Sequence, residues 1–554
     1  MKLKPNLQDY QKTYQDFSWV KAAKDFWGQD KKINLVTKVI DQQAKSKLKN
    51  KIALFWESED GQERQLTFFE IYLLANQFGN FLKSLNVKKG DRVFFFLPRI
   101  PAIYWGFLGT LKIGAVGGTL FPAFGSQGLL DRLGNSGAKV LVTNKELYQR
   151  IQPIEKKLPN LKKIVLVENL PNTLSHFPVN LEPELVAPDD PAFMLYTSAT
   201  GNTPVCGIVV PHKGFFQQHL TAKWILDLHE NDIYWCTADP GWVTGVVYGL
   251  LAPWSLGISQ IAFGGRFKPE KWYQLIEKYQ VSVLYTAPTA LRLLEKEEEI
   301  IENHDLSSLR HINSVGEALT TASVKWVNKA FKLPIYDTWW QTETGAMILA
   351  NYPSLPVKIG SMGKPIPGIK MAIVDDQGKS MPVNKVGHLV IKPPWPSMMI
   401  DVWQNKKRYK SYFKNNWFYT GDKASCDQDG YYWFAGRADD IIKTSGERVA
   451  PFDVESSLCD HPSVLEAGVI GKPDKIRGEI IKAFVVLKPK FKESEELRQE
   501  LQAYVKKNLA GHAYPREIDF VKNLPKNRSG KIVRRILKAR ELNLPLGDTS
   551  TLID

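Results

Sequence analysis

Residues Tyr419–Glu455 read YTGDKASCDQDGYYWFAGRADDIIKTSGERVAPFDVE and combine three kinds of polar chemistry in one stretch. Gly421-Asp422 predicts a carboxylate in a turn, suited to accept hydrogen bonds from a sugar diol. Gly436–Asp440 predicts a short polar linker between two segments whose sequence patterns differ. Ser445–Arg448 supplies a glycine for close backbone approach and a guanidinium for phosphate. Each fragment alone is better explained by a hairpin that turns at Gln428–Gly430 and continues into an ordinary linker.

The size and charge of the chain narrow the function classes. With 554 residues the chain is too long to fold around one hydrophobic core, so two or three domains are expected. Hydrophobic content of 44% and charged content of 24% are typical of a soluble globular protein. The net charge of +15 could indicate nucleic-acid binding, but the basic residues are scattered and form no recognisable module. We therefore expect no nucleic-acid partner and interpret the charge as a solvated basic surface that favours polyanionic substrates.

The cysteines and apolar runs bear on the compartment. The four cysteines stand far apart without a CxxC pair, which argues against a disulfide framework or zinc site and fits a reducing cytoplasm. The N-terminal residues MKLKPNLQDYQKTYQDFSW lack the apolar core of a signal peptide. The most apolar run, Ile100–Phe121, is interrupted by Lys112 and several glycines. It predicts a buried helix and strand, and we expect no membrane partner.

Helix-like and strand-like segments alternate through the first 440 residues. Thr67–Glu70 is a capping box that opens a helix with apolar residues at helical spacing. Strands are predicted at 93–97, 139–143, 163–167, 259–263 and 281–285, with a helix at 270–279 between the last two. Such alternation predicts an α/β architecture with largely parallel sheets.

The pattern shortens after Asp440. Strands are predicted at 464–470, 480–487 and 517–521, and a helix at 494–508. A segment of about 115 residues with this pattern predicts a small α+β domain. The boundary falls near Asp439, so we expect an N-terminal domain of residues 1–438 and a C-terminal domain of residues 439–554.

Residues 195–204, LYTSATGNTP, form a loop rich in hydroxyls directly after an apolar run. Loops of this kind direct backbone N–H groups and hydroxyls toward phosphate oxygens. The candidate contacts are Thr197, Ser198, Thr200, Gly201 and Thr203. The same pattern also fits an ordinary polar surface turn.

Three further loops, at 238–245, 285–289 and 314–317, are rich in glycine, proline or threonine or carry an acidic residue, and each ends an apolar run. In an α/β sheet, binding sites gather at such strand ends. The loops therefore predict a binding site on one edge of the sheet. They are equally well explained as packing loops around a buried tryptophan.

The most specific motif of the large domain is residues 337–345, DTWWQTETG. Thr342 places a hydroxyl beside the Glu343 carboxylate, a pair that can hold a phosphate oxygen and Mg²⁺ together because Mg²⁺ prefers oxygen ligands and substrate phosphates. The adjacent Trp339 and Trp340 also fit a role in the core. Near the C-terminus, residues 524–535, LPKNRSGKIVRR, place Lys531 after a Ser-Gly turn. A movable cation there can neutralise charge developing between a carboxylate and an α-phosphate, although a plain basic patch before a helix has the same appearance.

These motifs, in this order, resemble those of the adenylate-forming acyl-CoA synthetases, and the likeness covers essentially the whole chain. Segments 234–245, 360–368 and 541–548 look specifically like the shorter bacterial members that use acetate. The phosphate loop departs from the usual YTSGTTGxPKG. Ala199 replaces a glycine, one residue is inserted, and Val205-Cys206 stands where Lys-Gly would start. Asn527 is a departure from the family's PKTRSGK loop.

The resemblance implies a role for each candidate. Lys531, Thr342 and Glu343 would be catalytic, with Glu343 also holding the metal. The ATP- or AMP-binding positions would be Thr197, Ser198, Thr200, Gly201, Thr203, Gly316, Glu317, Ala318, Asp337, Thr338, Trp339, Gln341, Thr342, Asp422, Arg437 and Arg448. The acyl pocket would be formed by Trp242, Val243, Thr244, Val315 and Trp340. Ser445 and Gly446 would contact coenzyme A, and Asp439 would be the hinge.

The implied reaction is the ATP-dependent ligation of acetate to coenzyme A in two halves. Acetate attacks the α-phosphate of Mg·ATP to give acetyl-adenylate and pyrophosphate, and the thiol of coenzyme A then displaces AMP. Between the halves the C-terminal domain would turn about Asp439 and withdraw Lys531. Trp340 favours a short acid, because medium-chain relatives carry a glycine there. The implied fold is a large N-terminal α/β domain of layered sheets with a β-rich part, plus a small mobile C-terminal α+β domain.

Other classes stay open at this point. One is a ligase for propionate or a medium-chain acid, and another is a catalytically impaired nucleotide- or acyl-binding relative, since the phosphate loop is altered. A basic nucleic-acid-binding protein is motivated by net charge alone. The expected small molecules are acetate, ATP and coenzyme A with Mg²⁺. Because the family's catalytic lysine is a known acetylation target, a lysine acetyltransferase and a deacetylase acting on Lys531 are candidate partners.

Overall fold

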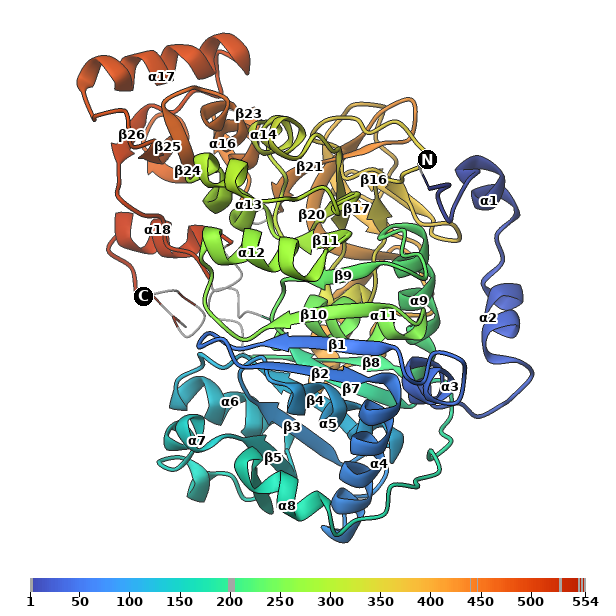
Figure 1. Cartoon of the computed structure of the whole chain (residues 1–554). Coiled ribbons are helices and arrows are strands. Elements are labelled where there is room, and N and C mark those ends of the chain that lie inside the picture. The colour runs from blue at the N-terminus through green and yellow to red at the C-terminus, as the bar shows by residue number, and fades with distance from the viewer. Residues whose placement is uncertain are drawn as a thin grey trace.

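The computed structural model describes residues 3–197, 205–438, 440–445, 447–527, 531–546, 549 and 552, apart from the side chain of Arg448. Within these residues the strands form four sheets, three in the large N-terminal domain and one in the small C-terminal domain (Figure 1). The expected fold class is confirmed. Over the described part of the chain, no helix combines the length and the apolar character needed to cross a membrane.

The first sheet has the strand order β18–β8–β7–β4–β3–β5–β6. Its strands are β3 (Arg92–Phe96), β4 (Val116–Leu120), β5 (Val140–Thr143), β6 (Lys163–Leu166), β7 (Pro191–Tyr196), β8 (Gly207–Pro211) and β18 (Asp401–Val402). In β3, Val93 and Phe95 join one core while Phe94 and Phe96 join another. Because both faces are buried, the strand reads as the continuous apolar run seen in the sequence.

The second sheet has the order β15–β14–β13–β12–β11–β9–β10–β1–β2. Its strands are β1 (Ile52–Glu57), β2 (Glu63–Thr67), β9 (Ile233–Cys236), β10 (Ser259–Phe263), β11 (Val283–Thr286), β12 (His311–Ser314), β13 (Ile335–Trp339), β14 (Leu349–Ala350) and β15 (Lys364–Pro365). Strands β9 to β13 pair in parallel, so the loops after β11, β12 and β13 leave the same edge of the sheet. That edge carries the candidate site.

Helices lie between the two sheets and on their outer faces. Between the sheets, α4 (Phe68–Ser84), α5 (Pro101–Lys112) and α9 (Phe215–Trp224) pack into the central core. Helices α6 (Ser126–Ser136) and α7 (Lys145–Ile151) cover the first sheet, and α12 (Pro269–Tyr279), α13 (Pro288–Glu295) and α14 (Thr321–Phe331) cover the second. The predicted capping box begins α4, and the apolar run 100–121 folds into α5 and β4 as predicted. Further helices are α1 (Tyr10–Asp16), α2 (Trp19–Trp27), α3 (Gln42–Ala44), α8 (Leu170–Leu174), α10 (Val243–Val246), α11 (Ala252–Ser255) and α15 (Lys406–Ser411).

The β-rich part contains β16 (Met371–Val374), β17 (Gly387–Ile391), β19 (Phe413–Lys414), β20 (Trp417–Cys426) and β21 (Tyr432–Arg437). Strands β20 and β21 form the hairpin whose turn was predicted at Gln428–Gly430. The last strand of this sheet ends at Arg437, directly before the predicted hinge.

The C-terminal domain has the strand order β23–β22–β25–β24, with β26 beside β25. Its elements are β22 (Ile442–Thr444), β23 (Glu447–Val449), α16 (Pro451–Cys459), β24 (Val464–Asp474), β25 (Gly478–Leu487), α17 (Glu495–Asn508), β26 (Glu517–Phe520) and α18 (Arg534–Glu541). Figure 1 shows this orange-to-red domain beside α13 and α14 of the large domain. The boundary at residue 439 stays a prediction, and Asp439 itself lies outside the described residues.

Candidate active site

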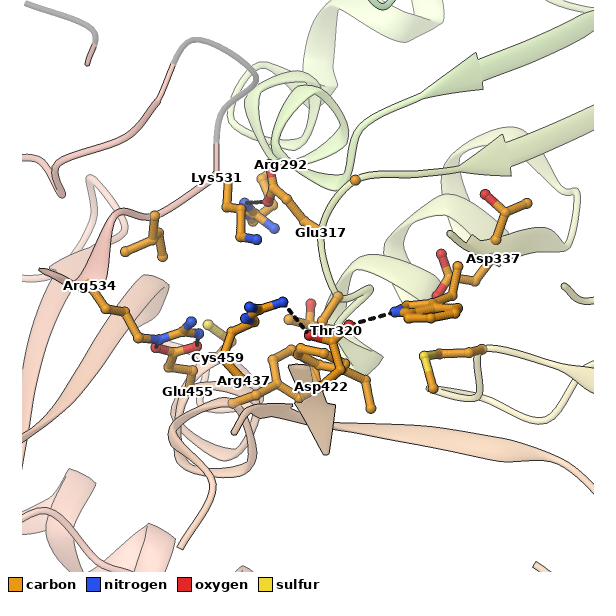
Figure 2. A pocket seen from close by; sticks show the side chains of 18 of the residues that line it. Arg292, Glu317, Thr320, Asp337, Asp422, Arg437, Glu455, Cys459, Lys531 and Arg534 are labelled. Carbon is orange, nitrogen blue, oxygen red and sulfur yellow. Dashed lines mark hydrogen bonds and ion pairs between the residues drawn. The ribbon is translucent and has the colours of Figure 1, made fainter. Parts of the chain in front are cut away.

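A cavity of about 190 Å³ lies where the C-terminal domain meets the edge of the second sheet at β12 and β13 (Figure 2). Among the predicted site residues, those that line it are Gly316, Glu317, Ala318, Asp337, Thr338, Trp339, Trp340, Gln341, Asp422, Arg437 and Lys531. The fold thus brings together motifs that are separated by up to about 200 residues in the chain. The roles of these residues stay predictions.

Residues 315–318 follow β12 along the cavity wall. Gly316 has φ +91°, a left-handed conformation that side chains disfavour, which explains a glycine at this turn. The Glu317 carboxylate lies against α13, where Thr289 Oγ1 is 2.7 and 2.9 Å from its two oxygens and an Arg292 nitrogen donates over 2.8 Å. These protein donors anchor the loop against the cavity.

Asp422 lies inside strand β20, so the predicted turn at Gly421-Asp422 is wrong. The pairing of β20 with β17 shifts register between His388 and Val390, and Gly421 has φ +77° at this irregularity. A glycine in the left-handed region can serve a β-bulge as well as a turn, and the pairing of β20 with neighbours on both sides selects the bulge. The bulge aims Asp422 at the cavity.

Three donors orient the buried Asp422 carboxylate. Trp339 Nε1 and Gln341 Nε2 donate to its Oδ2 over 3.0 and 3.2 Å, and Arg437 donates to its Oδ1 over 3.0 Å. Burial raises the pKa of the Asp422 carboxyl, while the cations Arg437 and Lys531 oppose that rise. A carboxylate held in this way keeps lone pairs for the hydroxyls of a ligand.

Lys531 comes from the C-terminal domain and lines the cavity opposite the large domain (Figure 2). Its backbone N–H donates to Asn527 Oδ1 over 2.9 Å. Enclosure by protein atoms lowers the pKa of Lys531, and Asp422 opposes this. The side chain nevertheless remains exposed to the open space of the cavity, so we assign it a positive charge. It is therefore a cation that lines the same cavity as the Asp422 carboxylate and interacts with it electrostatically.

Asp337 is buried in the middle of β13. Ser314 Oγ donates to its Oδ1. Burial raises the pKa of the Asp337 carboxyl to about 7, against the opposing effect of the Ser314 hydroxyl and the Thr338 N–H. The group therefore exchanges its proton near neutral pH.

Asp337→Asn should make the ligand-free protein more stable, and more so at higher pH. The unfolded carboxyl ionises near pH 4 and the folded one near pH 7, so the native chain loses stability as the pH rises across this window. Asparagine lacks this titration and still accepts from Ser314. The advantage of the variant should grow by about 2 kcal/mol between about pH 5.5 and pH 8.5. Thermal melting of both proteins at the two pH values measures this stability difference. An equal difference at both pH values would contradict the prediction.

A directed hydrogen-bond chain holds Trp340 in the cavity wall. Thr338 Oγ1 donates to Ser314 O over 2.7 Å, which uses its only proton. The Tyr285 hydroxyl, 2.8 Å from Thr338 Oγ1, must therefore donate to it. Tyr285 Oη is then left to accept from Trp340 Nε1 at 3.3 Å. Tyr248 packs edge-on against the same indole, with ring centroids 5.1 Å apart.

The other predicted acyl-pocket residues do not line the cavity. Val243, Val315 and Trp340 belong to or pack against the same central core. Thr244 is buried in α10, which continues into the turn that carries Tyr248. Trp242, just before α10, packs against Phe121 with ring centroids 5.5 Å apart. An acyl role for these residues stays a prediction.

Several predicted residues lie outside the cavity lining. Thr342 and Glu343 form a short 3₁₀ turn after Gln341, and Glu343 Oε1 accepts from the Tyr412 hydroxyl over 2.9 Å. Thr197 follows β7, and Ser445 is exposed in the turn between β22 and β23. Ser198, Thr200, Gly201, Thr203, Asp439 and Gly446 lie outside the described residues, as does the side chain of Arg448.

The sequence analysis missed four charged residues of the cavity wall, namely Arg292, Glu455, Glu466 and Arg534. Arg534 Nε donates to Glu455 Oε1 over 2.8 Å within the C-terminal domain. The available signal for Arg292 was an arginine among the apolar residues of α13, where a charge needs a partner. The partners themselves are distant in the chain and carry no local pattern.

The chain is similar to known proteins over its full length. The profile of the family described as AMP-binding enzyme matches residues 40–400, and that of the AMP-binding enzyme C-terminal domain matches residues 453–531. Acetyl-coenzyme A synthetase of Bacillus subtilis (strain 168) is 49% identical over 99% of this chain and 98% of its own length. Acetyl-coenzyme A synthetase of Methanothrix thermoacetophila is 39% identical over 95% of this chain and 86% of its own.

A solved structure supports the same assignment. The anthranilate CoA ligase AuaEII in complex with anthranoyl-AMP superposes with a TM-score of 0.86 at 31% identity, covering 94% of this chain and 99% of that one. The identities exceed what a shared fold alone requires, and they run through both domains. The chain therefore belongs to the AMP-binding enzyme family and, within this adenylate-forming superfamily, to the acetyl-CoA synthetases.

Proposed function

We propose that this chain ligates acetate to coenzyme A at the expense of ATP, through an acetyl-adenylate, and releases AMP and pyrophosphate. The observation that carries the proposal is one cavity in which Lys531 of the C-terminal domain faces Asp422, with Trp340 in the wall. Relatives named acetyl-coenzyme A synthetase, at 49% and 39% identity, support acetate as the acid.

In the first half-reaction an acetate oxygen attacks the α-phosphorus of ATP, and the bond to pyrophosphate breaks. The loop 315–318 would bind the base, and Asp422 would accept hydrogen bonds from the ribose hydroxyls. Lys531 would neutralise the negative charge that grows between the carboxylate and the phosphate, since a preorganised cation in an enclosed site stabilises such charge strongly. Trp340 would end the acyl pocket after a short chain.

Glu343 fits a Mg²⁺ ion that arrives with ATP. Its Oε1 is oriented by Tyr412, and within the described ranges no group of three His, Cys, Asp or Glu side chains forms a separate metal cage. Mg²⁺ is commonly held by one or two carboxylates together with substrate phosphates, which is the donor set available here. When bound, the ion would offset the charge of the phosphates, and Thr342 beside it would donate to a phosphate oxygen.

In the second half-reaction the thiol of coenzyme A attacks the acyl carbon, and AMP leaves. The C-terminal domain, residues 439–554, would first turn about Asp439, which moves Lys531 out of the cavity. Ser445 is exposed outside the cavity, so we expect it to meet coenzyme A after such a movement. One small domain would thus serve both steps in sequence.

A panel of acids tests the proposed reaction. Purified chain is supplied with ATP, Mg²⁺ and acetate, propionate, butyrate or hexanoate, and pyrophosphate release and acyl-CoA formation are followed. Acetate should give the highest kcat/KM. A preference for propionate would reassign the substrate, and no pyrophosphate with any acid would favour the catalytically impaired relative, which is motivated by the altered phosphate loop.

The altered loop should slow the first half-reaction without abolishing it. The family's lysine is absent from residues 198–207, and a charge-assisted hydrogen bond to phosphate contributes about 1.5–3 kcal/mol, or one to two decades in rate. Replacing Ser198–Gly207 by SGTTGTPKG should therefore raise the pyrophosphate-forming rate about 10- to 100-fold. Thioester formation from supplied acetyl-adenylate should stay constant. If the native chain already adenylates acetate as fast as the repaired one, the loop is not limiting.

Lys531 would also be the point of regulation. Acetylation would remove its charge and with it the proposed role in adenylation. The proposed rotation of the C-terminal domain would bring Lys531 out of the cavity, where a lysine acetyltransferase could reach it, and a deacetylase would restore activity.

A further inference from the structure

One arginine joins the two domains beside the cavity. Arg292, on α13 of the large domain, donates from a terminal nitrogen to Glu317 Oε2 over 2.8 Å. Its Nε donates to Glu466 Oε1 over 3.2 Å, and Glu466 belongs to β24 of the C-terminal domain. Figure 2 labels Arg292, Glu317 and Lys531, which all line the cavity. The guanidinium therefore binds one carboxylate from each domain.

All three charged groups are buried. The side chains of Arg292, Glu317 and Glu466 are 10%, 9% and 6% exposed. Water and salt screen such buried charges much less than exposed ones, so the ion pairs are effective while the domains are docked. Burial would raise the pKa of Glu466, but Lys526 and Arg292 hold it below its ordinary value, so the carboxylate is ionised at neutral pH.

The contact reaches the loop that carries Lys531. Lys526 Nζ lies 2.6 Å from each oxygen of Glu466, and the next residue, Asn527, accepts from the Lys531 backbone N–H. Glu466 is thus linked on one side to Arg292 and on the other to the start of the catalytic loop. The position of the C-terminal domain on Arg292 and the position of Lys531 in the cavity are set by the same chain of contacts.

The same contact can also separate without leaving a charged group unpaired. If the C-terminal domain turns away, Glu466 keeps Lys526 as its partner and Arg292 keeps Glu317 and Thr289. Neither side leaves an unpaired buried charge, so the separation avoids the main penalty of breaking a buried ion pair. Arginine suits this position because its fork donates in two directions at once, which lysine cannot do.

We propose that Arg292 is a positioning residue of the adenylation step: by bridging Glu317 and Glu466 it holds the C-terminal domain where Lys531 enters the cavity. This inference rests on the proposed function because its activity test measures the two proposed half-reactions. It predicts that loss of the bridge slows adenylation and spares thioester formation. Adenylation needs the docked domain, whereas attack by coenzyme A on acetyl-adenylate needs the domain released.

A second pair between the domains supplies the control. Lys488 Nζ lies 3.3 Å from Glu295 Oε1, one turn along α13, but Lys488 is 37% exposed. Exposed pairs contribute little because water and salt screen them. Glu295→Gln therefore removes an interdomain ion pair from the same helix without touching the buried bridge.

The variants are Arg292→Gln, Arg292→Lys and Glu466→Gln. Acetate-dependent pyrophosphate release should fall about 30-fold or more in Arg292→Gln and Glu466→Gln, since the docked arrangement loses its charge-assisted interdomain hydrogen bond. Arg292→Lys should recover part of this rate, and Glu295→Gln should match the native chain within about twofold. Thioester formation from supplied acetyl-adenylate and coenzyme A should change less than about threefold in every variant. Equal loss of both halves, or loss of neither, overturns the proposal.

Hydrogen exchange gives a readout that does not depend on acetate. In Arg292→Gln, amides of α13 and β24 at the interface should exchange faster while the sheet cores of both domains stay as protected as in the native chain. Glu466→Gln should give the same pattern from the other domain. If amide protection at the interface is unchanged in Arg292→Gln, the proposed bridge is wrong. If protection falls throughout both domains, Arg292 serves the stability of the fold and not the docking of the domains. If the native chain forms no pyrophosphate at all, the proposed function fails, and the exchange data still decide the bridge.

Discussion

Lys531→Ala should lose acetate-dependent pyrophosphate release by roughly 10²–10³-fold, the range found when a preorganised electrostatic group is removed from an active site. The reason is geometric. Lys531 is a cation in the cavity that faces Asp422, and within the C-terminal domain its loop is tied through Lys526 to Glu466. Conversion of supplied acetyl-adenylate and coenzyme A to thioester should continue at close to the native rate, because the proposed domain rotation would move Lys531 away before that step.

The two half-reactions must be measured separately to test this. Pyrophosphate release with ATP and acetate reports the first, and acetyl-CoA formation from synthetic acetyl-adenylate reports the second. Lys522→Ala removes an exposed lysine of the same domain and should leave both unchanged. If Lys531→Ala slows both halves equally, the lysine is structural or the domain does not alternate.

Trp340→Gly should shift the acid preference toward longer chains. The indole lines the cavity and is held there by Tyr285 and Tyr248, so it has little freedom to make room. Its removal opens space in which each added methylene contributes about 0.8 kcal/mol, or about fourfold in kcat/KM. Relative to acetate, hexanoate with four more methylenes should therefore gain roughly two decades. Acetate use should fall, because its methyl group loses its contact surface.

Trp340→Phe separates size from hydrogen bonding. Phenylalanine keeps most of the bulk but loses the N–H that donates to Tyr285. Its profile should stay near that of the native chain, with a modest gain for propionate as the ring becomes free to tilt. The kcat/KM values of acetate, propionate, butyrate and hexanoate measure both variants. An unchanged profile in Trp340→Gly would place the end of the acyl pocket elsewhere.

The sequence by itself determined the elements and the chemistry of their loops. The strand predicted at 259–263 and the helix predicted at 270–279 appear as β10 and α12, and the capping box begins α4. These features depend on neighbours within one or two turns, so apolar periodicity and capping residues are sufficient to predict them. The loop motifs are also local patterns of sequence. Their gathering at one edge was predictable because parallel strands place their ends at the same edge of a sheet.

The tertiary structure alone decided how these parts meet. Gly421-Asp422 is compatible with a turn or a bulge, and only the pairing of β20 with β17 and β21 selects the bulge that aims Asp422 at the cavity. Arg292 and Glu466 are 174 residues apart and share no periodic pattern. Their bridge exists because the two domains dock, and low exposure at that contact couples two ordinary charges that are distant in the chain.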